Sequence, residues 1–204
     1  MAQYFDNVEL KSEIRKIDID IFDMAFSFYS DNGVFCKDRL DYGTRLLLEN
    51  IDWNNVSGKI LDVGCGYGPI GIIASKITGS NVVMCDVNRR ALHLALRNVK
   101  ENNVDCKVIE SDCYQNIHDT FDVIITNPPI RAGKKIVYEI LFGAKDHLNN
   151  NGLLYLVIHK DQGAKSLVKD LEKEYKVEIL EKEKGFFIIK CKKGWLVDKN
   201  MLII

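Results

Sequence analysis

The sequence lacks an excess of charge of either sign and lacks a long hydrophobic run. Its 28 lysines and arginines face 29 acidic residues, for a net charge of -1, so any nucleic-acid surface must be a local patch. No stretch approaches the ~20 apolar residues that a membrane span needs, and residues 1–6 show no basic region before an apolar one. We therefore expect a cytoplasmic protein without a membrane partner.

Paired cysteine spacings are also missing. The six cysteines are scattered, without the short repeats of zinc sites and redox motifs, so we expect reduced thiols and no metal. The length of 204 residues, with 47% hydrophobic and 28% charged residues, suits one globular domain. We predict a single domain over residues 1–204, and a monomer is favoured.

What the sequence does contain is an alternation of short β-branched apolar runs with longer helical patterns. This order is typical of a mostly parallel sheet covered by helices. The runs of strand type occupy residues 59–63, 81–85, 106–110, 122–126 and 153–159. Apolar stripes with helical spacing occupy residues 89–101 and 134–147. We therefore predict a doubly wound α/β fold whose catalytic core spans residues 58–192.

A hairpin is predicted at the C-terminal end of this core. Residues 176–180 and 186–190 read as strands on either side of a charged turn at 181–185. An antiparallel edge of this kind is common on an otherwise parallel sheet.

A second hairpin is predicted near the N-terminus. Residues 14–21 and 24–29 alternate in part, and the leucine-rich segment 41–50 reads as a helix that leads into the sheet. The hairpin and the entering helix together make up residues 1–50 of the predicted domain.

The first informative motif is a glycine-rich turn. Residues 60–71 read ILDVGCGYGPIG, so an apolar strand passes through the turn into a helix, where backbone N–H groups can face a ligand. A dinucleotide fold would place its third glycine five positions after the first, but this chain has Pro69 there. The glycines fall instead at Gly64, Gly66 and Gly68, a pattern that resembles the first motif of class I methyltransferases.

Polar residues mark the carboxyl ends of four successive predicted strands. The glycine-rich turn, with Asp62 beside it, follows the first strand, and Asp86, Asp112 and Asn127 follow the next three. In open α/β sheets, the crevice outside these strand ends is where ligands bind, and an acid after the second strand can bind ribose hydroxyls. Asp86 and Asp112 could instead cap the following helices. Because such residues occur at four successive strand ends, we favour a shared ligand-binding site over helix capping.

Asn127-Pro128-Pro129 is the most specific motif. Proline restricts the residue before it to extended geometry, so the segment is rigid and can aim the Asn127 side-chain oxygen and the Pro128 carbonyl at one point. An amino group on a planar base or an amide is a poor nucleophile, because its lone pair is delocalised. Two acceptors that hold its hydrogens would favour a pyramidal nitrogen facing a methyl donor. We predict that these three residues are catalytic.

Three segments together resemble the methyltransferase small-domain family, which includes guanine-N2 methyltransferases of ribosomal RNA. They are residues 33–44 (GVFCKDRLDYGT), 61–66 (LDVGCG) and 126–134 (TNPPIRAGK). The resemblance implies a Rossmann-like methyltransferase sheet, S-adenosylmethionine as cofactor, and an RNA substrate, with ribosomal RNA or a ribosomal subunit favoured. The cofactor-binding residues that we expect from the motifs and the resemblance are Asp41, Gly43, Thr44, Asp62, Gly64, Cys65, Gly66, Asp86, Asp112, Cys113 and Asn127.

Two features depart from the pattern of the family. Many members that methylate planar amines have an aromatic residue after the second proline, where it stacks on the target, whereas this chain has Ile130. Larger members carry a duplicated domain before the catalytic one, for which 204 residues leave no room. Ile130 and the nearby cations Arg131, Lys134 and Lys135 are the expected substrate contacts, although the cations could equally form a solvated helix start.

These observations favour methylation of an exocyclic amine of a base in RNA, with guanine N2 of ribosomal RNA indicated by the resemblance. The same two-acceptor geometry suits a glutamine amide in a protein such as a release factor, or N6 of adenine. A non-catalytic cofactor-binding module for assembly is an alternative of another class. Pro69 and the Asn-Pro-Pro segment argue against a nicotinamide oxidoreductase.

Overall fold

The computed structural model of this chain describes residues 11–34, 36 and 38–194. Residues 1–6, on which one expectation rests, lie outside the described residues. So do positions 35 and 37 of the segment 33–44 that resembles the family. No helix in the part that is described is long and apolar enough to cross a membrane.

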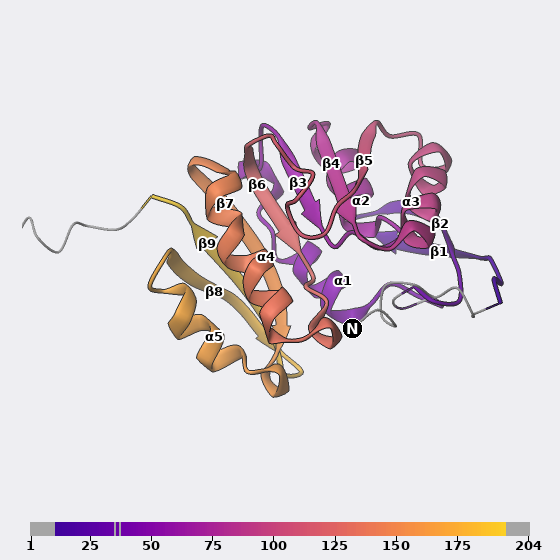
Figure 1. Cartoon of the computed structure of the whole chain (residues 1–204). Coiled ribbons are helices and arrows are strands. Elements are labelled where there is room, and N and C mark those ends of the chain that lie inside the picture. The colour runs from indigo at the N-terminus through magenta and orange to yellow at the C-terminus, as the bar shows by residue number, and fades with distance from the viewer. Residues whose placement is uncertain (1–10, 35, 37, 195–204) are drawn as a thin grey trace, which may run out of the picture.

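A seven-stranded sheet forms the centre of the described chain, with the strand order β5-β4-β3-β6-β7-β9-β8 (Figure 1). Its parallel strands are Ile60–Val63 (β3), Val82–Asp86 (β4), Cys106–Glu110 (β5), Phe121–Thr126 (β6) and Leu148–His159 (β7). The predicted doubly wound, mostly parallel α/β sheet is therefore confirmed. Strand β7 begins five residues earlier than predicted, because Leu148 pairs with Phe121 across a register shift.

The predicted terminal hairpin is present as Lys176–Glu183 (β8) and Phe186–Lys192 (β9). β9 pairs antiparallel with β7, so the hairpin extends the parallel sheet. The strands run further into the charged turn than predicted and leave a two-residue connection, Lys184 and Gly185, with φ values of 47° and 87°. A two-residue turn with positive φ at both positions matches the twist of the flanking strands, which explains the shorter turn.

Helices cover both faces of the sheet (Figure 1). One face carries Tyr42–Glu49 (α1), Pro69–Thr78 (α2) and Arg89–Glu101 (α3), and the other carries Lys134–His147 (α4) and Ala164–Leu171 (α5). Each face of the sheet forms its own hydrophobic core with the helices that cover it. Neighbouring strand residues alternate between the two cores: Ile60 lies in the core with α1, α2 and α3, and Leu61 lies in the core with α4 and α5. Because both faces are buried, the strands read as continuous apolar runs. Helices α3 and α4 have the predicted bounds, whereas α5 was not predicted.

The predicted N-terminal hairpin consists of Arg15–Ile21 (β1) and Met24–Ser30 (β2) and lies against α3 (Figure 1). Two side-chain amides, those of Asn98 in α3 and of Asn102 at its C-cap, pair with the backbone of β2. Asn98 Oδ1 accepts from the Tyr29 N–H at 2.6 Å and its Nδ2 donates to the Tyr29 carbonyl at 3.0 Å. Asn102 makes the same pair of bonds with Ser27, at 3.1 and 2.8 Å.

The chain order creates a crevice between β3 and β6. From β3 the chain moves outward through β4 to β5, and then returns to place β6 on the other side of β3. The turns that follow β3 and β6 therefore leave in opposite directions. In open α/β sheets, ligands bind in the crevice that opens between two such turns. Thr126 Oγ1 donates to the Val63 carbonyl at 2.8 Å and ties the two strand ends together below this crevice.

Candidate active site

A pocket of about 560 Å³ opens at this edge of the sheet. Its lining includes the glycine-rich turn after β3, Asp86 at the end of β4, Asp112 after β5 and Asn127 after β6. The four predicted strand-end elements therefore meet in one cavity, whose size suits a small molecule.

The glycine-rich turn forms an open wall of this pocket. Gly64 and Gly66 have φ values of 72° and 57°. A Cβ at Gly64 would come within 3.8 Å of Pro129 Cδ across the pocket, and one at Gly66 would meet no heavy atom within 4 Å. Side chains at these positions would project into the cavity, so the glycines keep a backbone cradle clear for a ligand. The N–H groups of Gly64 and Cys65 donate to the Cys85 carbonyl at 2.8 and 2.9 Å and fasten the turn to β4.

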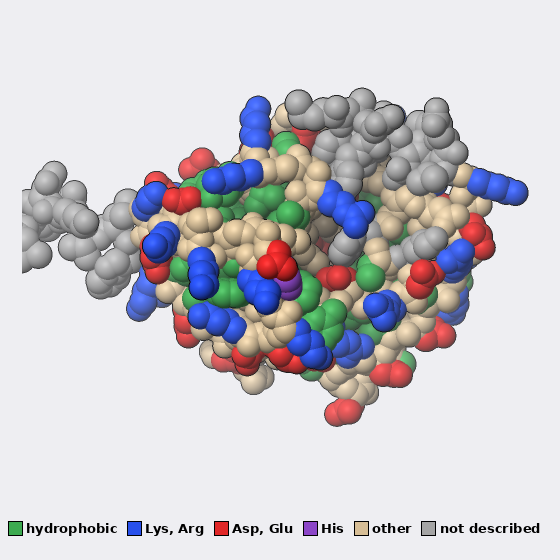
Figure 2. Space-filling model, turned by 90° about the horizontal axis from the view of Figure 1, so that it is seen from below, with side chains coloured by type: hydrophobic (Ala, Val, Ile, Leu, Met, Phe, Trp, Pro, Cys, Tyr) green, Lys and Arg blue, Asp and Glu red, His purple; other side chains and the backbone are tan. Residues whose placement is uncertain are grey.

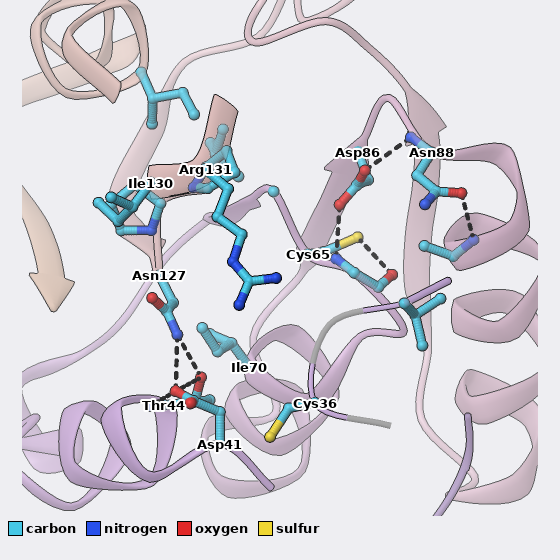
Figure 3. A pocket seen from close by; sticks show the side chains of 18 of the residues that line it. Cys36, Asp41, Thr44, Cys65, Ile70, Asp86, Asn88, Asn127, Ile130 and Arg131 are labelled. Carbon is cyan, nitrogen blue, oxygen red and sulfur yellow. Dashed lines mark hydrogen bonds between the residues drawn. The ribbon is translucent and has the colours of Figure 1, made fainter. Parts of the chain in front are cut away.

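Asp86 holds the other side of the turn. One carboxylate oxygen accepts from the Gly66 N–H and the other from the Asn88 N–H, both at 2.8 Å (Figure 3). Burial raises the pKa of Asp86 although these two bonds oppose the rise. Asp86 does not cap α3, because Asn88 takes that role by accepting from the Arg90 and Ala91 N–H groups. The remaining lone pairs of the Asp86 carboxylate can therefore accept from hydroxyl groups of a ligand.

Asp62 lies behind the turn and does not line the pocket. Its side chain is fully buried; Oδ2 accepts from the Gly71 N–H in α2 at 2.9 Å, while Oδ1 has no hydrogen-bond partner among the described residues. Burial raises the pKa of Asp62 to about 8, so the group is mainly protonated at neutral pH. Asp62 thus links the glycine-rich turn to α2 rather than facing the cavity.

Asn127 is held by two residues from the start of α1. Its Nδ2 donates to Asp41 Oδ2 at 3.0 Å and to Thr44 Oγ1 at 2.9 Å (Figure 3). Asp41 is the N-cap of α1, and the same oxygen accepts from the Thr44 N–H at 2.8 Å. A carboxylate only accepts hydrogen bonds, so the NH₂ end of the amide must face Asp41. Both amide hydrogens are used in this way, and Oδ1 is directed away from α1 as an acceptor.

Asp112 and Cys113 form the wall beyond β5. The Asp112 side chain is exposed, and the Cys113 thiol donates to its Oδ1 at 3.7 Å. Burial raises the pKa of the Cys113 thiol to about 12 and that of Cys65 well above its ordinary value. Since the thiolate is the nucleophile, these cysteines line the pocket as small neutral side chains.

The expected substrate residues divide into two pairs. Ile130 and Arg131 line the pocket, and Figure 3 shows the Arg131 guanidinium reaching into it. Lys134 and Lys135, at the start of α4, are exposed and lie outside the lining, with the Lys134 ammonium 4.7 Å from the centre of the Tyr138 ring.

The remaining predicted residues also sort by position. Pro128, Pro129 and Thr44 line the pocket, whereas Gly43 does not. Gly43 lies beneath Phe186, because a Cβ there would come within 2.9 Å of the Phe186 ring.

Several pocket residues were missed from the sequence, namely Asn88, His159, Gln162 and Phe186. Asn88 carried a usable signal, since an asparagine directly before a helical stripe is a typical N-cap. His159 and Phe186 were placed inside predicted strands, where a side chain's direction depends on strand pairing and not on the local pattern.

A family model and several known proteins match most of this chain. Residues 25–190 match the family described as Methyltransferase small domain. The uncharacterized protein YbxB of Bacillus subtilis is 42% identical over 195 residues, which cover 93% of this chain and 97% of that protein. Ribosomal RNA small subunit methyltransferase C of Haemophilus influenzae is 38% identical over 156 residues, 74% of this chain and 47% of that protein. This chain thus spans about half the length of that relative.

A solved structure gives the same fold. The T. thermophilus 16S rRNA N2 methyltransferase RsmC, in complex with AdoMet and guanosine, superposes with a TM-score of 0.80 at 23% identity. The superposition covers 91% of this chain and 52% of that chain.

Proposed function

Since this chain belongs to the methyltransferase small-domain family, we propose that it transfers a methyl group from S-adenosylmethionine to an exocyclic amine of a base in RNA. The favoured target is guanine N2 of ribosomal RNA, either free or in a subunit, which would place the protein in the cytoplasm. Residues 1–204 act as one methyltransferase domain in this proposal, with the hairpin and entering helix in 1–50 and the catalytic core in 58–192.

The pocket suits the cofactor at its glycine-rich end. The open cradle at Gly64 and Gly66 gives backbone access, and Asp86 and Asp112 present carboxylate oxygens at the pocket wall for hydroxyl and amino groups. When bound, S-adenosylmethionine supplies an electrophilic methyl group on a sulfonium. Cys65 and Cys113 add neutral, apolar surface to the same wall.

The observation that carries the proposal is the fixed amide of Asn127. Asp41 and Thr44 take both of its hydrogens, so its oxygen is available to accept from a target amine. The Pro128 carbonyl, on the rigid Asn-Pro-Pro segment, is the second acceptor in this proposal. Together they turn the nitrogen lone pair toward the methyl donor. Donating that lone pair to the new N–CH₃ bond would leave the nitrogen positively charged and strongly acidic, so one of its two protons can leave to water without a dedicated base.

The cations around the pocket support an RNA substrate. Figure 2 views the molecule from below relative to Figure 1, and on this face Lys and Arg side chains lie among apolar side chains, with Asp and Glu side chains between them. Arg131 reaches into the pocket, and Lys134 and Lys135 lie exposed at the start of the next helix. Such positions can contact phosphates while the overall charge of the chain stays near neutral.

The proposal is tested by transfer of a labelled methyl group from S-adenosylmethionine to RNA, DNA and protein fractions of cells that lack the gene. We expect label in ribosomal RNA, and mass spectrometry of its nucleosides should identify N2-methylguanosine. Asn127→Ala should bind the cofactor nearly as the parent does but transfer methyl ~10²–10³-fold more slowly in single turnover. Label in protein instead would indicate a glutamine amide, and cofactor binding without any labelled fraction would indicate an assembly module.

A further inference from the structure

An aromatic side chain reaches the pocket from a strand that runs against the others. Phe186 is the first residue of β9, and His159, the last residue of β7, is its partner in the register. Because β9 is antiparallel, it begins at the sheet edge where the parallel strands end. Both residues line the pocket. The C-terminal hairpin therefore supplies a ring to a site that is otherwise built mainly by the segments after the parallel strands and by the start of α1.

Neighbouring residues hold the Phe186 ring in place. The His159 ring lies at 71° to it in a T-shaped pair with a centroid distance of 4.9 Å, and the Tyr42 ring is tilted at 51° with a centroid distance of 5.6 Å. Gly43 permits the close approach to α1, because a Cβ there would lie 2.9 Å from Phe186 Cε1. The ring is half-buried. Neither His159 nor Tyr42 lies parallel to the ring, so both hold it in place through T-shaped or tilted contacts and not through parallel stacking.

The ring lies at the end of the pocket that holds Asn127. The Cβ position of Gly43 that nearly touches Phe186 is also 3.1 Å from Asp41 Oδ2, the oxygen that accepts from Asn127 Nδ2 at 3.0 Å. Tyr67 also lines the pocket, but it belongs to the glycine-rich turn and is only 4% exposed. Among the described residues that line the pocket, Phe186 thus offers a more exposed ring than Tyr67 next to the amide that would orient the target amine.

We propose that Phe186 is the stacking surface for the target base, held in place by the ring of His159. This inference rests on the proposed function and names the class of substrate. A base must leave its stack to enter such a pocket, and flipped bases are held by aromatic contact as well as by hydrogen bonds. Ile130 on the opposite segment offers no ring, so the C-terminal hairpin provides one. A glutamine amide has much less flat surface, so the subsite favours a nucleobase over a protein side chain.

The test measures steady-state methylation of ribosomal RNA from cells that lack the gene. Phe186→Leu keeps an apolar side chain but removes the ring, and should lower kcat/KM by about 10- to 100-fold. Phe186→Tyr retains the ring and should stay within about threefold of the parent. The affinity for S-adenosylmethionine, measured by calorimetry, should be unchanged in both variants, because the ring lies at the target end of the pocket.

Phe142→Leu is the matched control, since Phe142 is also half-buried and paired with another ring, Tyr138 at 5.2 Å, but lies outside the pocket. It should behave as the parent does. Equal losses in Phe186→Leu and Phe142→Leu, or a parental kcat/KM in Phe186→Leu, would overturn the stacking role while leaving RNA methylation intact. A parent protein that labels only protein, or no fraction at all, would overturn the proposed function and this inference with it.

Discussion

Because Asn127 donates to Asp41, replacing Asn127 with aspartate should make the stability of the protein depend strongly on pH. Asn127→Asp replaces a donor by a carboxylate at a position 3.0 Å from Asp41 Oδ2. Two unit charges at that distance repel by roughly 5 kcal/mol at an effective dielectric constant of about 20, which corresponds to roughly 4 pKa units. Movement of the two carboxylates will reduce this repulsion, and about 2 units is the smallest shift that we expect.

This repulsion makes the stability of the variant depend on pH. A like charge raises the pKa of one carboxyl in the folded state above its unfolded value of about 4. The folded variant therefore matches the parent best below about pH 4 and loses stability as the pH rises toward the raised pKa. A shift of 2 units costs about 3 kcal/mol, or a Tm lower than that of the parent by roughly 6–12 °C at pH 7.

Thermal unfolding of the parent and of Asn127→Asp between pH 4 and pH 8 measures this difference. The control is the double variant Asp41→Asn with Asn127→Asp, which exchanges the amide and the carboxylate and leaves one charge. Its Tm difference from the parent should be nearly independent of pH, and it should recover methyl transfer better than Asn127→Asp alone. A Tm difference between Asn127→Asp and the parent that stays constant over this range would refute the contact between Asp41 and Asn127.

Three further predictions concern other parts of the site. Burial raises the pKa of Asp62 to about 8 in the folded protein. The parent should therefore lose stability relative to Asp62→Asn as the pH rises from 4 to 8. A difference in unfolding free energy between the two proteins that stays constant over this range would contradict the prediction. Asp86→Ala should weaken S-adenosylmethionine binding in calorimetry by on the order of 1–3 kcal/mol; unchanged affinity in a folded variant would remove Asp86 from the site. Replacing both Lys134 and Lys135 with alanine should make RNA binding less dependent on salt. The slope of the logarithm of the RNA association constant against the logarithm of the salt concentration should fall by about 1 for each phosphate that the lysines neutralise in the parent, and the affinity for the cofactor should be retained. An unaltered slope would assign both lysines to the solvated surface.

The local pattern of the chain was sufficient for the order and type of most elements. The bounds of α3 and α4 were predicted residue for residue, because each is a clear apolar stripe. The early start of β7 at Leu148 was missed, since three asparagines and a glycine follow that residue and read as a turn. Pairing with Phe121 outweighs that local preference.

The sequence by itself determined the strand-end motifs, because the glycine-rich turn and Asn127-Pro128-Pro129 are contiguous and their backbone restraints are local. Only the tertiary structure decided which side chains these motifs meet. Asn127 is bound by Asp41, 86 residues earlier in the chain, and Phe186 enters the site because β9 runs antiparallel to β7. Such contacts depend on strand register, helix placement and side-chain direction. The packing of the whole domain sets these features, so the local sequence pattern does not predict them.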